Sequence, residues 1–395
     1  MNDYVANDNT PPRTEIPTFS QWDELSLPTD ILRGIYAYGF ETPSPIQGKA
    51  IMPMVEGHDI VAQAQSGTGK TGAFTIGALS RIDVDASYPQ VIILSPTREL
   101  SLQINDVVQK IGSFSKIKSQ LLVGGSSVDR DMSQLDRLQP HVIVGCSGRV
   151  HDMIRRGALK TDKLKTIVVD EADEMLDIGF KDQMQDIFRT LPENIQVALF
   201  SATLPEYTLD VVKEFMRAPV HIIVKREALT LEGISQYYVA IENDHQKYET
   251  LKDLYSSFNV SQCIIYCNSV ERVKKLYDAM NNDDYPVCCI HGDMDRKSRE
   301  KSISDFRTGT NRVLISSNVT ARGIDVQQVS VVINFDICKN VHTYLHRIGR
   351  SGRWGRKGVG INFVTRRDIH RLRDIEQYYS TQVIELPTNF MQTIV

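Results

Sequence analysis

A short glycine-rich run carries the residues best suited to bind phosphate. Residues 64–71 read Ala-Gln-Ser-Gly-Thr-Gly-Lys-Thr and follow an apolar, strand-like run. Gly67 and Gly69 allow backbone N–H groups to turn toward a polyphosphate at the start of the next helix. Lys70 then brings a positive charge to the outer phosphates, and Thr71 offers a hydroxyl ligand to Mg²⁺. The run therefore predicts a nucleotide triphosphate site.

A second run supplies the carboxylates that phosphoryl chemistry needs. Residues 170–173 read Asp-Glu-Ala-Asp directly after another apolar run. Asp170 is placed to hold Mg²⁺, and Glu171 to orient and deprotonate an attacking water. Each run also has a simpler explanation. The first can be a glycine-rich turn, since Ala64 replaces the first glycine of the common pattern, and the second can be an acidic helix start.

Alternating strands and helices position these runs. Short apolar, β-branched stretches lead into polar or glycine-rich corners and then helical patterns, which is typical of parallel sheets covered by helices on both faces. The predicted strands are Ile60–Ala62, Val91–Leu94, Val142–Val144, Thr166–Val169, Val197–Phe200, Cys263–Cys267, Val287–Ile290, Arg312–Ile315, Ser330–Asn334 and Gly360–Val364, and the last helix is expected at about Asp368–Tyr379. The fold class is therefore α/β.

The alternation also predicts the domain organisation. A chain of 395 residues suggests two or three domains. The pattern breaks near Lys225, so we expect a linker at residues 226–233 between domains at 19–225 and 234–395. Residues 1–18 are polar, and we expect a flexible arm there.

Composition excludes several classes of protein. Hydrophobic residues make up 41% and charged residues 24%, which predicts packed cores rather than wholesale disorder. No apolar run approaches the roughly 18 residues of a membrane span, and the N-terminus lacks the pattern of a secretory signal. The net charge of −4 argues against a generally basic surface, although nine Arg or Lys occur between Arg347 and Arg373. The six cysteines form no CxxC pair, and we expect reduced thiols.

Together the motifs resemble those of the DEAD-box RNA helicases, and within them the eukaryotic translation initiation factor 4A group with its exon-junction paralogue. The likeness covers residues 19–395 and the motifs follow family order. They are Gly39–Gln47, the run ending at Lys70-Thr71, Pro96–Leu100, Gly124-Gly125, Asp170–Asp173, Ser201–Thr203, His291–Asp293, Ala321–Asp325 and His346–Arg353. This resemblance implies two RecA-like domains that close around ATP, Mg²⁺ and RNA.

The resemblance assigns further residues to the nucleotide. Gln47 is expected to bond the adenine edge, Phe40 to stack on the base, and Asp325 to bind the ribose. Arg350 and Arg353 are expected to reach the transferred phosphoryl group from the second domain. The rest of the implied ATP site comprises Ser66, Gly67, Thr68, Gly69, Lys70, Thr71 and Gly323, while Ser201 and Thr203 are expected to couple hydrolysis to strand separation. Trp22 is expected in core packing, and Arg347 in a structural role.

The resemblance places RNA across both domains on the side opposite the nucleotide. The implied RNA contacts are Thr97, Arg98, Gly125, Gly148 and Arg149 in the first domain, and Gly292, Arg299, Ser317 and Gly323 in the second. Such contacts go mainly to phosphates and 2′-OH groups, so we expect weak sequence preference and binding that weakens with salt.

Three departures from the family pattern lie on this RNA side. The usual Thr-Pro-Gly-Arg is Cys146–Arg149, the usual Gln-x-x-Arg is Arg296–Arg299, and the usual Thr-Asp is Ser317-Asn318. The first replaces a hydroxyl with a weakly bonding thiol, and the others make the second domain more positive. The hypothesis is that the ATP site is unaltered and RNA affinity is retuned, with neutral drift as the alternative.

The leading prediction is an ATP-dependent RNA helicase, that is, an RNA-stimulated ATPase acting in translation initiation or another RNA-processing step. The alternative is an ATP-gated RNA clamp that serves as a platform for partner proteins, and a DNA-directed motor is a remote third. We expect a cytoplasmic monomer that binds RNA and protein partners of the scaffold or exon-junction type and no membrane. Nothing in the sequence excludes the nucleus.

Overall fold

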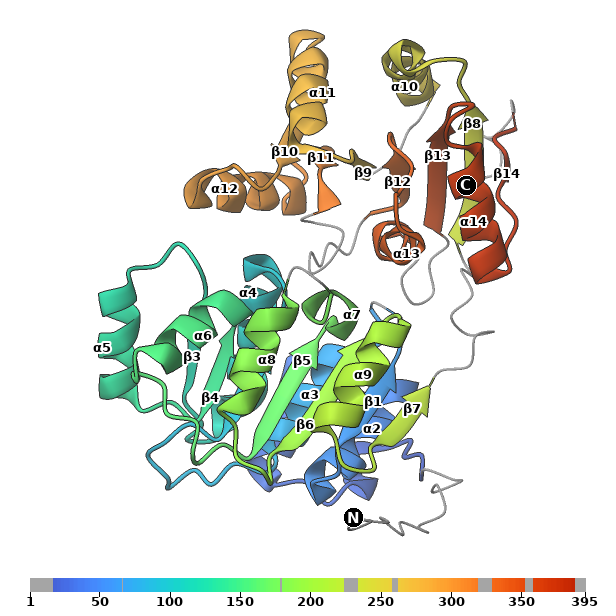
Figure 1. The fold of residues 1–395 in the computed structure, drawn as a ribbon. Helices are drawn as coiled ribbons and strands as arrows, with labels where there is room; N and C mark the ends of the chain where they lie inside the picture. Colours follow the sequence, from blue (N-terminus) through green and yellow to red (C-terminus); the bar gives the residue numbers. More distant parts are fainter. Residues whose placement is uncertain are drawn as a thin grey trace, which may run out of the picture.

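The computed structural model describes residues 17–65, 67–177, 180–223, 234–257, 262–318, 329–351 and 358–387. Within them lie two seven-stranded sheets, which divide the chain into a first domain (residues 17–223) and a second domain (residues 234–387). Every strand pair in both sheets is parallel. The predicted linker at 226–233 lies outside the described residues. Figure 1 shows the second domain, yellow to red, stacked on the first, blue to green.

The first sheet has the order β3-β4-β2-β5-β6-β1-β7. Its strands are β1 (Ile60–Gln63), β2 (Val91–Leu94), β3 (Ser119–Leu122), β4 (Val142–Gly145), β5 (Thr166–Asp170), β6 (Gln196–Ser201) and β7 (Val220–Ile223). Its helices are η1 (Trp22–Glu24), α1 (Thr29–Tyr38), α2 (Pro45–Glu56), α3 (Lys70–Leu79), α4 (Arg98–Ile111), η2 (Gly112–Phe114), α5 (Val128–Leu138), α6 (Ser147–Arg155), α7 (Ala172–Met175), α8 (Lys181–Arg189) and α9 (Glu206–Phe215).

The second sheet has the order β10-β11-β9-β12-β13-β8-β14. Its strands are β8 (Ile234–Ala240), β9 (Cys263–Tyr266), β10 (Val287–Ile290), β11 (Val313–Ser316), β12 (Val331–Asn334), β13 (Gly358–Val364) and β14 (Ile384–Glu385). Its helices are η4 (Asp244–Gln246), α10 (Lys247–Ser257), α11 (Val270–Asn282), α12 (Arg296–Arg307), α13 (Val341–Ile348) and α14 (Ile369–Tyr379).

Both faces of each sheet are buried, which explains the continuous apolar runs. In β2, Val91 and Ile93 join the core under α1 to α4, whereas Ile92 and Leu94 join the core under α5 to α9. The second sheet is covered in the same way, by α12 to α14 on one face and by α10 and α11 on the other. Because successive strand residues point to opposite faces, a strand covered on both sides needs apolar residues at every position. The predicted α/β fold is thus confirmed.

Two further sequence expectations can be compared with the structure. All six cysteines are free, as expected for reduced thiols. Among the described residues, no helix combines the length and apolar character that crossing a bilayer would require.

Candidate nucleotide site and RNA surface

The glycine-rich loop joins β1 to α3. Gly67 and Gly69 have φ values of 83° and 102°, which residues with a side chain rarely adopt. A Cβ atom on Gly69 would lie 2.7 Å from Ser44 Oγ, so the close approach of α2 also requires glycine there. Lys70 is the first residue of α3, and its buried Nζ donates a hydrogen bond of 2.8 Å to the Ala64 carbonyl oxygen inside the loop. The loop is therefore folded around its own lysine, while Ser66 lies outside the described residues.

The run at residues 39–47 packs directly against this loop. Gln47 Nε2 donates to the Gly69 carbonyl oxygen at 3.3 Å, and Gln47 Oε1 accepts from the Ser44 N–H in the capping box of α2. Phe40 is only half-buried and lies beside Gly72, so its ring is accessible for stacking. Trp22 is fully buried, and its Nε1 donates to the Phe40 carbonyl oxygen at 3.0 Å, which agrees with the expected core role.

The acidic motif, residues 170–173, concentrates negative charge in a buried place. Asp170 ends β5, and Asp170, Glu171 and Asp173 are all at most 3% exposed. Glu171 has a φ of 52°, a strained value for a non-glycine residue, and its N–H donates to Asp170 Oδ1 at 3.0 Å. Burial, and next the charge of Glu171, raise the pKa of Asp170 to about 7.

This charge concentration fits a divalent cation. Asp170, Glu171 and Asp173 are all buried, and the charge of Lys70 lowers the pKa of Asp170 only in part. Oxygen ligands of this kind suit Mg²⁺, and Asp170 with the Thr71 hydroxyl at the start of α3 would hold it. When bound, the ion would neutralise charge on a polyphosphate.

Two hydroxyls join the acidic motif to the end of β6. Thr203 Oγ1 donates to Asp173 Oδ2 at 2.6 Å, and the N–H groups of Asp173 and Thr203 each donate to Ser201 Oγ at 3.4 Å. The structure therefore connects Ser201 and Thr203 to the carboxylates, and their coupling role stays a prediction.

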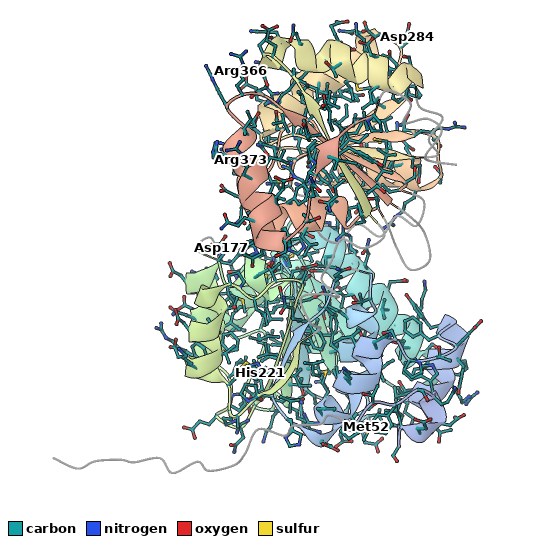
Figure 2. All side chains as sticks on the ribbon, turned by 90° about the vertical axis from the view of Figure 1, so that its right-hand side faces the viewer. Met52, Asp177, His221, Asp284, Arg366 and Arg373 are labelled. Carbon is teal, nitrogen blue, oxygen red and sulfur yellow. The ribbon has the colours of Figure 1, made fainter. Side chains whose placement is uncertain are left out.

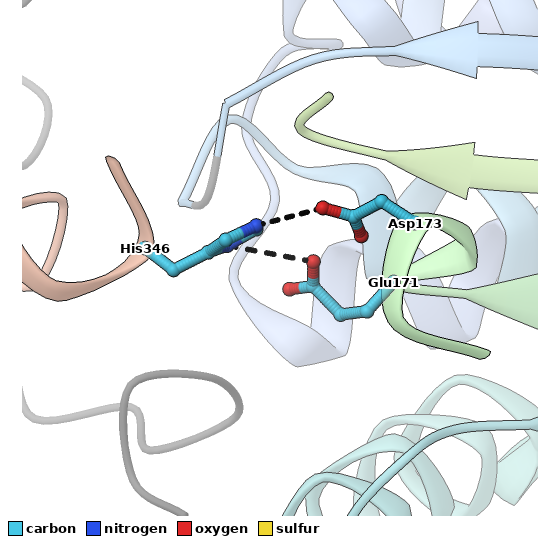
Figure 3. A group of neighbouring side chains, drawn as sticks. All are labelled: Glu171, Asp173 and His346. Carbon is cyan, nitrogen blue, oxygen red and sulfur yellow. Dashed lines mark hydrogen bonds and ion pairs between the residues drawn. The ribbon is translucent and has the colours of Figure 1, made fainter. Parts of the chain in front are cut away.

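His346 of the second domain reaches the same carboxylates across the domain boundary. Figure 3 shows its imidazole between Asp173 and Glu171. Its Nε2 lies 2.9 Å from Asp173 Oδ2 and its Nδ1 lies 3.7 Å from Glu171 Oε2, with all three side chains buried. The sequence motif alone indicates no role for His346. The only sequence signal for this contact is that His346 opens the same motif as Arg350.

The two arginines that follow His346 in the sequence, Arg347 and Arg350, have different surroundings. Arg350 is buried, and its Nε donates to the His346 carbonyl oxygen at 3.2 Å, just after α13. Arg347 is fully buried and bonds Asn268, Asn318, Asn334 and the Asp336 carbonyl oxygen within the second domain, which agrees with its expected structural role. Gly323, Asp325 and Arg353 lie outside the described residues.

The expected RNA contacts of the first domain follow β2, β3 and β4, the half of the sheet away from the glycine-rich loop. Arg98 Nη1 donates to the Gly124 carbonyl oxygen at 2.9 Å, and Thr97 caps α4 by accepting from the Leu100 N–H. Arg149 forms an ion pair with buried Asp131 and donates to Ser126. These arginines are held in place by protein groups, yet a guanidinium has five N–H donors and some remain for phosphate. A Cβ atom on Gly125 would meet nothing within 4 Å, and one on Gly148 would meet only Gln183 Oε1 at 3.6 Å.

The expected contacts of the second domain follow β10 and β11, at one edge of its sheet. Arg299 donates to the carbonyl oxygens of His291 and Gly292 and reaches Glu99 Oε1 of the first domain at 3.3 Å. Ser317 is 7% exposed, and its Oγ has no hydrogen-bond partner among the described residues. Glu300 pairs with Arg98 at 3.4 Å, so this side of the molecule also has two ion pairs across the boundary.

The three departures can now be placed. Cys146 is the N-cap residue of α6 without a side-chain cap, and its Sγ lies 3.5 Å from Ser101 Oγ. Burial raises the pKa of the Cys146 thiol, so it stays protonated and uncharged. Asn318 Oδ1 accepts hydrogen bonds from two nitrogens of Arg347. The side chain therefore has a structural contact inside the second domain. The Arg296 side chain lies outside the described residues.

Comparison with known proteins agrees with this geometry. Residues 44–211 match the DEAD/DEAH box helicase family and residues 246–355 match the helicase conserved C-terminal domain. An ATP-dependent RNA helicase eIF4A from Pyricularia oryzae is 52% identical over 377 residues, 95% of each chain.

Solved structures add the arrangement of the domains. The Saccharomyces cerevisiae protein Dbp5 bound to RNA and ADP BeF₃ has a TM-score of 0.86 at 37% identity, over 92% of this chain and 95% of that one. Mss116p bound to ssRNA and AMP-PNP has a TM-score of 0.84 at 25% identity, over 97% and 83%. Such scores require both domains to superpose together, so the sheets are arranged as in nucleotide- and RNA-bound relatives. A phosphate loop and acidic motif in one RecA-like domain, met by a histidine of the second, thus place the chain in the DEAD-box family of ATP-dependent RNA helicases.

Proposed function

We propose that this protein hydrolyses ATP when single-stranded RNA is bound and separates short duplexes locally as its domains close. The contact of His346 with Asp173 and Glu171 carries this proposal. Because residues of both domains meet at the carboxylates, domain closure assembles the site. ATP and RNA then favour the same arrangement, and each should tighten binding of the other.

The residues divide the chemical work. Glu171 orients the attacking water and takes its proton, Lys70 binds the outer phosphates, and Arg350 supplies positive charge from the second domain. Asp170 and Thr71 would hold Mg²⁺, which would neutralise charge on the phosphates. Gln47 and Phe40 recognise the base, and we extend the nucleotide site to Ser66, Gly323, Asp325 and Arg353 by family likeness.

RNA lies along the other half of each sheet. Arg98, Arg149 and Arg299 contact its phosphates, assisted by Thr97 and Ser317. A Cβ atom on Gly125 or Gly292 would meet no atom within 4 Å, so the surface there leaves room for the strand. We propose a cytoplasmic monomer acting in translation initiation, as the name of its fungal relatives suggests.

Steady-state phosphate release tests the proposal. The full chain is assayed with saturating ATP and Mg²⁺, with and without single-stranded RNA, at low and moderate salt. We expect strong stimulation by RNA that weakens as salt rises. Glu171→Gln should bind ATP without turnover, whereas Asp182→Asn, which changes an exposed carboxylate on α8, should behave as the parent. Turnover that is independent of RNA would contradict the proposal.

The clamp alternative has one observation in its favour. Among the described residues, polar contacts hold the domains together at His346 with Asp173 and Glu171, at Arg299–Glu99 and at Arg98–Glu300. A chain that binds RNA with an ATP analogue but releases phosphate slowly, or is locked on RNA by a partner, would favour the clamp.

A further inference from the structure

A groove in the second domain lies apart from both the nucleotide and the RNA residues. It runs between α14 and the strands β8 and β13, with a cavity volume of about 500 Å³. Its apolar lining includes Ile241, Val364, Ile369, Leu372 and Val383. Ile369, the first residue of α14, is 42% exposed, so part of this apolar surface faces solvent. An exposed apolar surface within a hollow is typical of an interaction site.

Positive charge borders the groove. Arg366 and Arg373 line it, are exposed, and have no hydrogen bond or ion pair to any residue that the structure describes. Figure 2 shows both on the same side of the second domain. The nearby acids are less available: Glu376 accepts the Val383 N–H, and Asp368 accepts from Thr365 and Arg371. Glu242 alone remains as an exposed acid on the rim.

The position of the groove leaves it accessible during the reaction. In the second sheet the expected RNA residues follow β10 and β11, whereas the groove lies at β13 and β8, toward the opposite edge. Five strand spacings separate β10 from β8, roughly 24 Å at about 4.8 Å each. None of the assigned nucleotide residues lines the groove, and a ligand there leaves the expected RNA residues free.

We propose that this groove docks an acidic, apolar peptide segment of a partner protein. Leu, Ile or Phe side chains of the segment fill the apolar floor, and its Asp or Glu residues pair with Arg366 and Arg373. Arginine favours such pairing because its planar guanidinium binds a carboxylate through two parallel hydrogen bonds. Docking at this groove does not depend on the ATPase activity. A partner bound there could direct the chain to its RNA.

The test is selection from a random 12-residue peptide display library on the immobilised full-length chain. We expect enriched peptides to combine apolar residues with two or more acids. The best peptide is labelled for fluorescence anisotropy. Its affinity for the Arg366→Glu/Arg373→Glu variant should be at least about tenfold lower than its affinity for the parent. Ile369→Asp should weaken peptide binding to a similar degree. Arg307→Glu, which changes an exposed residue at the end of α12 in the same domain, should leave peptide binding unchanged.

Two controls keep the outcomes separate. RNA-stimulated ATPase should be unchanged in all three variants, which shows that they fold, and peptide binding by a chain without ATPase would contradict only the proposed function. Enrichment of no acidic apolar peptide, or equal binding to the parent and the Arg366→Glu/Arg373→Glu variant, would overturn the docking proposal. Self-association of the parent that the variant loses would also overturn it, because the occupant would then be a second copy.

Discussion

The second sheet repeats the strand order of the first with seven added to each strand number. Each domain also has a lysine at the start of the helix after its first strand, Lys70 in α3 and Lys247 in α10. Each has an aspartate at or just beyond the end of its fifth strand: Asp170 is the last residue of β5, and Asp336 lies two residues after β12. The two domains therefore place the same pair of residue types at the same point of one topology.

The surroundings of the two pairs differ. Lys247 is 3% exposed and forms ion pairs with Asp336 at 3.2 Å and Asp244 at 3.0 Å, and Arg272 also pairs with Asp336. Lys70 instead bonds a backbone carbonyl in a loop with two glycines of positive φ, whereas residues 241–246 contain no glycine. The comparison teaches that the topology supplies the position, and that the glycine-rich loop decides whether the lysine meets phosphate or an internal carboxylate.

The largest effect is expected from substituting one carboxylate in each domain, because the change should lower turnover in the first domain and stability in the second. Glu171→Gln is expected to lower RNA-stimulated turnover by about 10²- to 10⁴-fold with ATP binding retained, because it removes the proton acceptor. Asp336→Asn should keep turnover per folded molecule and lose stability. Phosphate release and nucleotide binding, measured together, check this, and equal turnover in Glu171→Gln would show that another group is the base.

Substituting the two lysines, one at a time, should give the next largest effect. Lys247→Met leaves Asp336 and Asp244 with one buried partner fewer, and we expect a loss of about 3 kcal/mol in unfolding free energy. Lys70→Met should instead weaken ATP binding with little change in stability. Urea unfolding and ATP titration of both variants check the contrast, which fails if Lys247→Met weakens ATP binding as much as Lys70→Met.

The raised pKa of Asp170, about 7, predicts a pH dependence of stability that originates in the first domain. Between pH 4 and 7 the folded state keeps a proton that the unfolded state releases, so the contribution to unfolding free energy falls as pH rises through this window. Without Mg²⁺ and nucleotide, Asp170→Asn should be more stable than the parent by about 2 kcal/mol at pH 8 and nearly equal at pH 4. Urea unfolding at both values tests the sign. Asp336→Asn is the control, and we expect it to be destabilised at pH 8.

The smallest effects are expected on the RNA side. Cys146→Thr restores a hydroxyl in the first domain and should tighten RNA binding about two- to threefold, since one phosphate contact contributes little of the total. Arg296→Gln in the second domain should reduce the salt slope by about one unit. RNA anisotropy over a salt series measures both, and two unchanged variants would favour neutral drift.

The sequence predicted the continuously apolar strands better than the strands that are short or contain polar, solvated positions. β2, β4, β5, β9 and β10 were expected within a residue of their bounds, because burial on both faces makes them continuously apolar. β3 at Ser119–Leu122 and β14 at Ile384–Glu385 were missed, since edge strands are partly solvated or very short. β7 and β8, which carry Val220 and Ile234, also went unpredicted; β8 mixes exposed and buried positions.

In the candidate site, too, the sequence predicted the residues with a local pattern and not the contacts between domains. Lys70, Asp170 and Glu171 follow strand ends in sequence, so local pattern locates them. The pairing of His346 with Asp173, and of Arg299 with Glu99, depends on how two separate domains meet. Residues 173 positions apart give no periodic signal of contact, so these pairs need the structure.

The pairing of β14 with β8 has a consequence for synthesis of the chain. The first sheet has all its strands by Ile223, before β8 begins at Ile234. The last residue of β8, Ala240, precedes Ile384 by 144 residues (384 − 240), which at roughly 5 to 20 residues per second means a delay of about 7 to 29 s on the ribosome. During that time β8 lacks first both neighbours and then, once β13 (Gly358–Val364) has been made, still β14, so its edge is open to other nascent chains. The first domain can fold as it emerges, whereas the second needs protection from aggregation until its final strand appears.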